Sequence, residues 1–344
     1  MTGRPRFGLR IPPCRPLTEV AACVRDAEDA GFDVAWLPDS QFLWRDVWGG
    51  MTLAAAQTSS IALGTCVTNL ETRHPSVTAA AAAGVAELAP GRVVLGLGSG
   101  DSAVKTLGLK PTGLARMREQ IELLRALLAG EPADFDGRSL AVKAAGPAVP
   151  IYLAATGPKM QALAGELADG VIVVTGLEPD LVRATLARIG AGAARAGRRV
   201  EELDVCFGTY AHVASDRREA ARIAKPYVVA TAQTGGQALL HELGIHIDPP
   251  ELVGGIYPDM SHAEDWDAAA EAAAEWVSDE QALRFGDAFC LIGSPDELAR
   301  RLAAAAEAGA RSFYIRHFSS YTLPSELLGT FAEAVLPRFG GGGS

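Results

Sequence analysis

Short apolar segments alternate with helical segments along most of the chain. Eight apolar segments have the length and residue types of buried β-strands: 6–11, 33–37, 61–68, 93–97, 151–155, 170–174, 205–213 and 312–317. A segment with helical periodicity follows each of them, and glycines such as Gly31 and Gly197 end two of these helices. Eight strands that are each followed by a helix predict an α/β fold, a (β/α)8 TIM barrel.

Two stretches interrupt this order. Residues 135–142, with Asp136-Gly137 between apolar residues, predict a β-hairpin before the fifth strand. Residues 231–285, between the seventh and eighth strands, are rich in Gly, Pro and His and irregular, so we expect an insertion that covers the barrel mouth as a lid or substrate wall. Residues 1–339 are expected to form one barrel domain, and 340–344 resemble a flexible linker or the remnant of a tag.

The fourth strand leads directly into Gly98-Ser99-Gly100-Asp101. Glycines without a β-carbon let a planar ligand approach the backbone there, although a tight turn after a core strand explains the same residues equally well. The dinucleotide motif G-x-G-x-x-G does not fit, because the third glycine comes early and no helix is expected before Thr112. The nucleophile motif G-x-S-x-G does not fit either, so both a doubly wound fold and a serine hydrolase are disfavoured.

The composition excludes several classes of partner. The net charge of −10 argues against nucleic acid as a partner. No apolar segment is long enough to span a membrane, and no leader sequence is seen before Arg6, so we expect a cytoplasmic protein without a membrane partner. The five cysteines and six histidines are dispersed and form no C-x-x-C or helical metal pair. No metal site is therefore expected.

The active site of a barrel lies at the carboxyl ends of its strands. The residues that follow the predicted strands there are small and polar, include two carboxylates, and show no cluster of cations: Asp39, Ser40, Cys66, Val67, Asn69, Ser99, Asp101, Thr156, Gly157, Thr175 and Gly176. This set suits a flat, polar cofactor. Thr156-Gly157-Pro158 opens a helix, where free N–H groups would bind a phosphate, although an ordinary helix cap accounts for it as well.

Several motifs, taken in their order along the chain, indicate a resemblance to a known family. They are Trp36-Leu37-Pro38-Asp39 with the segment to Asp46, Gly64-Thr65-Cys66-Val67-Thr68-Asn69 with Arg73-His74-Pro75, Gly91-Arg92-Val93 through Asp101, Ala155-Thr156-Gly157-Pro158, and Ala168-Asp169-Gly170-Val171. With these motifs the chain resembles the bacterial luciferase-like superfamily, in the branch that depends on coenzyme F420, an 8-hydroxy-5-deazaflavin. The resemblance extends from the first strand to the eighth and is weakest in 231–285.

The resemblance implies roles for individual residues. A non-proline cis peptide at Cys66-Val67 would support the deazaflavin ring, and the ring and its polar edge would contact Asp39, Asn69, Gly98, Ser99 and Asp101. The ribityl chain and phosphate would contact Thr156, Gly157, Thr175 and Gly176. His74 is expected to cap a helix rather than to do chemistry. Ser40 stands where the glucose-6-phosphate dehydrogenase branch has a histidine, which argues against that activity.

The resulting hypothesis is an F420H2-dependent reductase that transfers hydride between C5 of the deazaflavin and a C=C, C=O or C=N carbon of a small-molecule substrate. Asp101 is the first candidate for the proton donor, because a carboxyl enclosed between glycines and a flat ring keeps its proton more readily. Asp39 is the second candidate, and Trp44 is expected to form a wall of the substrate pocket. An FMN-dependent monooxygenase and a non-catalytic deazaflavin-binding protein are the alternatives, and a homodimer is the usual assembly of the superfamily.

Overall fold

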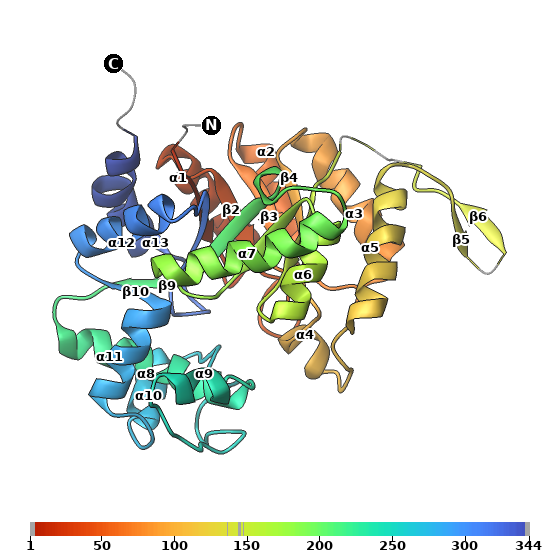
Figure 1. Ribbon diagram of the computed structural model, residues 1–344. Helices are drawn as coiled ribbons and strands as arrows, with labels where there is room; N and C mark the ends of the chain where they lie inside the picture. The colour runs from red at the N-terminus through yellow and green to blue at the C-terminus, as the bar shows by residue number, and fades with distance from the viewer. Residues whose placement is uncertain (1–3, 136, 144–145, 147, 341–344) are drawn as a thin grey trace.

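The computed structural model describes residues 4–135, 137–143, 146 and 148–340. Within them eight parallel strands form a closed barrel, which confirms the predicted fold class (Figure 1). In barrel order these strands are β1 (Arg6–Arg10), β2 (Val34–Leu37), β3 (Ala62–Thr65), β4 (Val93–Leu97), β7 (Ile151–Ala154), β8 (Gly170–Val173), β9 (Asp204–Val213) and β11 (Ser312–Arg316). Pairing of β8 with β9 and of β11 with both β9 and β1 closes the ring.

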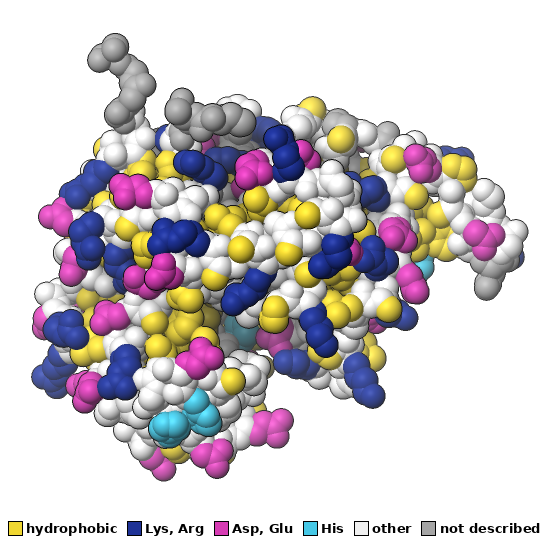
Figure 2. Space-filling view, in the orientation of Figure 1, with side chains coloured by type: hydrophobic (Ala, Val, Ile, Leu, Met, Phe, Trp, Pro, Cys, Tyr) yellow, Lys and Arg dark blue, Asp and Glu magenta, His cyan; other side chains and the backbone are white. Residues whose placement is uncertain are grey.

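Helices surround the barrel and bury their apolar faces against it. They are α1 (Leu17–Asp29), α2 (Val47–Gln57), α3 (Pro75–Leu88), α5 (Leu114–Leu128), α6 (Pro158–Leu167), α7 (Pro179–Arg195), α12 (Pro295–Glu307) and α13 (Ser325–Thr330). No helix in the described ranges has both the length and the apolarity that a membrane crossing requires. Acidic and basic side chains are interspersed on the face displayed in Figure 2.

Trp36 of β2 fills the inside of the barrel. Its ring lies 5.9 Å from the ring of Tyr152 and 6.2 Å from that of Tyr314. Gly8 and Gly64, on the two strands beside β2, make room for the indole, because a β-carbon on either would collide with the Trp36 side chain. The interior below the strand ends is therefore a packed core.

Some elements differ from those predicted. Asp101 precedes a one-turn helix, α4 (Ser102–Lys105), so the expectation of no helix before Thr112 is wrong. A four-residue strand, β10 (Cys290–Gly293), pairs with Tyr210–Val213 of β9 and was not predicted, since it is short and follows a helix without a turn. The predicted hairpin is confirmed as β5 (Ala133–Phe135) paired with β6 (Arg138–Leu140), while its turn residue Asp136 lies outside the described residues.

The segment between β9 and β10 contains four helices. They are α8 (Arg217–Gln233), α9 (Gln237–Glu242), α10 (Trp266–Ala273) and α11 (Asp279–Phe289), of which α9 and α11 were not predicted. Figure 1 shows them gathered at one end of the molecule, apart from the helices that surround the barrel. They share an apolar core that includes Val228, Trp266 and Phe285, which explains why so irregular a sequence is ordered.

Glu28, near the end of α1, fixes the turn that leads into β3. One carboxylate oxygen accepts hydrogen bonds from the backbone N–H groups of Ser59, Ser60 and Ile61 and from the Ser60 hydroxyl, at 2.5–2.9 Å. Partial burial raises the pKa of this carboxyl, but the hydrogen bonds outweigh burial and lower it to about 2.

We therefore expect Glu28→Gln to lower the free energy of unfolding at pH 7. A carboxyl whose pKa is depressed by folding stabilises the fold above its unfolded-state pKa of about 4.3 and loses this contribution as pH falls toward 2. Urea unfolding of both proteins from pH 7 to pH 2.5 should show their difference shrinking as pH falls. A difference that is constant with pH would contradict this role.

Candidate active site

A cavity of about 140 Å³ opens at the carboxyl ends of β1, β2, β3, β4 and β11. Of the predicted site residues, those that line it are Asp39, Trp44, Cys66, Val67, Asn69 and Asp101. Those that do not are Gly98, Ser99, Thr156, Gly157, Thr175 and Gly176. A larger cavity of about 480 Å³ lies at the ends of β9 and β11 and contains none of the predicted residues.

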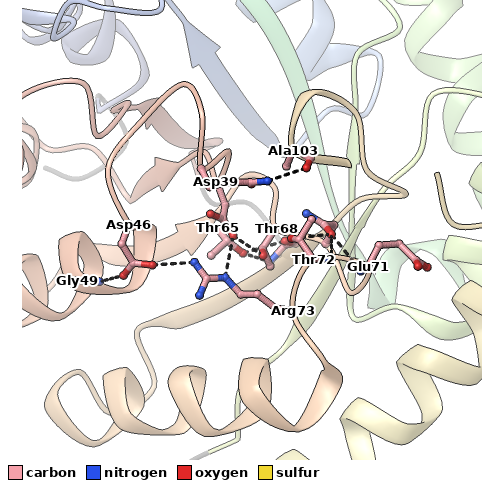
Figure 3. Close-up of polar contacts among 12 residues, drawn as sticks. Asp39, Asp46, Gly49, Thr65, Thr68, Glu71, Thr72, Arg73 and Ala103 are labelled. Atoms are coloured by element: carbon pink, nitrogen blue, oxygen red, sulfur yellow. Dashed lines mark hydrogen bonds and ion pairs between the residues drawn. The ribbon is translucent and has the colours of Figure 1, made fainter. Parts of the chain in front are cut away.

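Asp39 follows β2 and is the buried carboxyl of the cavity, with its side chain 7% exposed. Its Oδ2 accepts a hydrogen bond from the Thr68 hydroxyl at 2.7 Å and lies 3.5 Å from Nε of Arg73 (Figure 3). Burial raises the pKa of this carboxyl, and the hydrogen bond and the arginine offset burial only in part. Asp39 therefore holds a proton more readily than an exposed aspartate.

Arg73 and Asn69 organise the loop after β3. Arg73 also donates to the Asp46 carboxylate at 2.7 Å, and Asp46 caps α2 by accepting from Gly49 N–H, so one guanidinium joins two carboxylates (Figure 3). The Oδ1 atom of Asn69 accepts from the N–H groups of Glu71 and Thr72, which closes a turn of this loop. Asn69 thus presents its side chain to the cavity from a fixed position.

Asp101 differs from its predicted environment. Its side chain is 66% exposed, and its carboxylate pairs with Lys105 Nζ at 2.6 Å, one turn along α4. The expectation that it is enclosed is wrong, because the four-residue helix that it precedes turns the carboxylate outward to a lysine. Of the two predicted carboxyls, that of Asp39 is the more enclosed.

The peptide bond Cys66-Val67 is cis, as the resemblance implied. Burial raises the pKa of the Cys66 thiol to about 11, so this thiol is protonated at neutral pH. Gly98 packs against this segment: its N–H donates to Thr68 O at 2.9 Å, and a β-carbon there would lie 2.6 Å from Cγ2 of Val67. Glycine at 98 therefore lets β4 approach the cavity wall closely.

The remaining predicted residues lie at neighbouring strand ends. Thr156 and Gly157 come before α6, and a β-carbon on Gly157 would meet no atom within 4 Å, so this helix start is open. The Thr175 hydroxyl hydrogen-bonds that of Thr185 at 3.0 Å, and Gly176 has a φ of +87° that favours glycine. Their part in binding a ribityl chain and phosphate stays a prediction.

Two arginines and a histidine were missed. Arg10 ends β1, Arg316 ends β11, and His262 comes from the segment before α10; all three line the cavity. The statement that the rim has no cluster of cations is therefore wrong. A usable signal was present, because Arg10 and Arg316 are charged residues at the carboxyl ends of barrel strands whose central residues are uncharged.

Trp44 lines the cavity, and its place in the wall of a substrate pocket stays a prediction. Its indole N–H donates to Ser320 O at 2.8 Å, and the Arg10 guanidinium lies 5.1 Å from its ring centre. The centre of the His262 ring lies 5.9 Å from that of the indole, with the two ring planes at 72°. His74 caps α3 by accepting from Ser76 N–H, which confirms that prediction.

The comparisons with known proteins cover nearly the whole chain. Residues 4–312 match the family model described as luciferase-like monooxygenase. The chain is 33% identical to 5,10-methylenetetrahydromethanopterin reductase of Archaeoglobus fulgidus (88% of this chain, 91% of the relative). It is 31% identical to F420-dependent glucose-6-phosphate dehydrogenase of Beutenbergia cavernae (91% and 90%). The solved coenzyme F420-dependent tetrahydromethanopterin reductase of Methanopyrus kandleri superposes with a TM-score of 0.76 at 25% identity (98% and 100%). This chain belongs to the luciferase-like monooxygenase family.

Proposed function

We propose that this protein is a coenzyme F420-dependent oxidoreductase that transfers a hydride between the deazaflavin and a C=C, C=O or C=N carbon of a small organic substrate. The observation that carries the proposal is the agreement of two comparisons, one by sequence and one by structure. Both lead to relatives whose names include coenzyme F420, and both cover nine-tenths or more of the chain.

The residues around the cavity fit this cofactor. A flat ring with a polar edge matches the part of the cavity that has an apolar wall from Val67 and polar groups from Thr68 and Asn69. The glycine at 98 keeps the β4 side close to the Cys66-Val67 segment. The open start of α6 at Gly157 offers free backbone N–H groups to a phosphate.

The bound cofactor supplies the hydride at C5. Within the chain, Asp39 supplies the proton that a reduced carbonyl, imine or alkene needs, because it is enclosed and its pKa is raised. Arg73 and Thr68 fix the direction of this carboxyl. Trp44 and His262 form the substrate wall, so the segment before α10 contributes to substrate choice.

The substrate is not glucose 6-phosphate under this proposal. Position 40 carries a buried serine, whose hydroxyl accepts from Ser102 at 3.0 Å and cannot act as an imidazole base. A reductase does not require a base at this position.

Titration of the protein with oxidised F420 and, separately, with FMN tests the proposal. We expect F420 to bind with a change in its absorbance and FMN to bind much more weakly, and reduced F420 to be consumed with an acceptor from a substrate panel. Gly98→Ala should weaken F420 binding by displacing Val67, whereas Gly84→Ala, where a β-carbon meets nothing within 4 Å, should not. Tighter binding of FMN with oxygen consumption would favour a monooxygenase, and F420 binding without turnover would favour a carrier protein.

A further inference from the structure

We infer that Arg10 and Arg316 form an anion subsite that holds a carboxylate or phosphate group of the substrate. The inference rests on the proposed function, since it specifies the class of molecule that the same cavity accepts. It is carried by two adjacent guanidinium groups, that of the buried Arg10 and that of the half-buried Arg316, neither of which has a carboxylate partner among the described residues.

The strand register places the two arginines side by side. Leu9 of β1 pairs with Ile315 of β11, so Arg10 and Arg316 are the next residues on adjacent strands. Neighbouring parallel strands are about 4.8 Å apart. Both side chains line the cavity, and each follows by two positions a residue that contacts the barrel interior, Gly8 and Tyr314. Both guanidinium groups therefore face the same space.

Arg10 is 2% exposed, yet its polar atoms are poorly satisfied. Its Nη1 has no hydrogen-bond partner in the described residues, and its Nη2 reaches only the Ser320 hydroxyl at 3.4 Å. The Trp44 ring lies beside it at 5.1 Å. An arginine has five N–H donors, so most of the donor capacity of Arg10 is unused.

Arg316 is held more firmly. Its Nη2 donates to the Tyr210 hydroxyl at 2.7 Å, and its guanidinium lies 4.1 Å from the centre of the Tyr210 ring. Its Nε has no partner among the described residues. Tyr210 thus fixes the plane of this guanidinium and leaves one edge free.

The acidic groups around the pair are engaged elsewhere. Asp39 binds Thr68 and Arg73, and Asp101 binds Lys105. Asp259 of the insertion binds His262 at 3.0 Å. In the described part of the chain neither guanidinium forms an ion pair with a carboxylate.

The other titratable neighbours do not supply a negative charge either. Burial raises the pKa of the Cys66 thiol to about 11 and that of the Tyr314 hydroxyl well above its usual range, so both are neutral at pH 7. Burial and the two arginines lower the pKa of His317 to about 3, so it adds no further positive charge.

Two like charges on adjacent strands, one of them buried, are costly to the fold on their own. An oxyanion between them would pair with both charges and satisfy the free Nη1 and Nε donors, since the planar guanidinium suits carboxylate and phosphate oxygens. The pair therefore fits a ligand that arrives with its own negative charge.

Isothermal titration of the cofactor-free protein with inorganic phosphate, crotonate and crotonamide tests this subsite. We expect phosphate or crotonate to bind and the neutral amide, which has nearly the same shape, to bind much more weakly. Arg10→Gln and Arg316→Gln should each weaken anion binding about 10- to 100-fold, as for a lost charged hydrogen bond. Arg183→Gln, on the exposed face of α7, is the matched control and should bind as the wild type does.

The outcomes separate this inference from the proposed function. Equal binding of crotonate and crotonamide, or unchanged anion binding in both arginine variants, would overturn the subsite. So would variants that lose affinity for oxidised F420 while their anion binding is unchanged, because the arginines would then be cofactor ligands. Failure of the wild type to bind F420 would overturn the proposed function and leave the anion result standing.

A thermal melt distinguishes the subsite from a structural role. Because Arg10 has no charged partner among the residues that the structure describes, its removal leaves no unpaired charge there, and Arg10→Met should leave the melting temperature of the cofactor-free protein unchanged or raise it. The same variant should no longer be stabilised by a saturating anion. A variant that melts several degrees lower and keeps its anion response would show that Arg10 serves the fold alone.

Discussion

Asp39→Asn should lower kcat for F420H2-dependent reduction by about 100- to 10,000-fold, the range of a lost general acid. The affinity for F420 should change much less, because asparagine keeps the size of the side chain. The donor must be protonated, so wild-type kcat should fall as pH rises through the raised pKa of Asp39. A kcat–pH profile of both proteins checks this, and the variant should lack that limb.

Asp101→Asn is the matched comparison. Its carboxylate is exposed and paired with Lys105, so its loss should reduce kcat only a few-fold. If Asp101→Asn removed the pH-dependent limb and Asp39→Asn kept it, the donor would be Asp101, and α4 would have to rearrange when the substrate binds.

Gly192→Ala should destabilise the protein although alanine favours helices. The substitution gains about 1 kcal/mol in helix propensity. Its β-carbon would, however, collide with the backbone carbonyl of Ala162 in α6, and a β-carbon on Gly165 of α6 would collide with Ile189 O of α7. Backbone atoms cannot rotate away, so α6 and α7 must separate, and overpacking of this kind costs about 1–3 kcal/mol. Urea unfolding should show a lower midpoint.

Gly190→Ala provides the control within the same helix. Its β-carbon would meet only the Val200 side chain, at 3.6 Å, so the gain in propensity of up to about 1 kcal/mol should appear as added stability. Equal effects of the two substitutions would mean that the helix crossing does not depend on the glycine at 192.

The barrel was predictable from the sequence because its signal is repeated. Eight apolar segments that are each followed by a helical segment are compatible with few other folds. Every barrel strand overlaps the segment predicted for it. β10 and α9 were missed because four- and six-residue elements carry at most two periods of a strand or helix pattern. Their order comes from tertiary contacts with β9 and α8, which a local pattern does not contain.

For the candidate site, the sequence predicts which residues lie at the strand ends. Position along a strand indicates that Asp39, Cys66 and Asn69 reach the rim, and all three line the cavity. It does not indicate which carboxyl is enclosed, because that depends on Lys105 and Arg73, which come from a helix and a loop. His262 was not predictable, since the segment that brings it to the rim is positioned by packing against other helices, through Met260 and Ala263.

The indole of Trp36 closes the inside of the barrel, so the site is open at one end only. With the channel plugged between Gly8 and Gly64, nothing passes through to the far end of the strands. Cofactor, substrate and product must therefore enter and leave the site from the same end of the barrel. The molecule that lies deepest in the site should bind first and dissociate last.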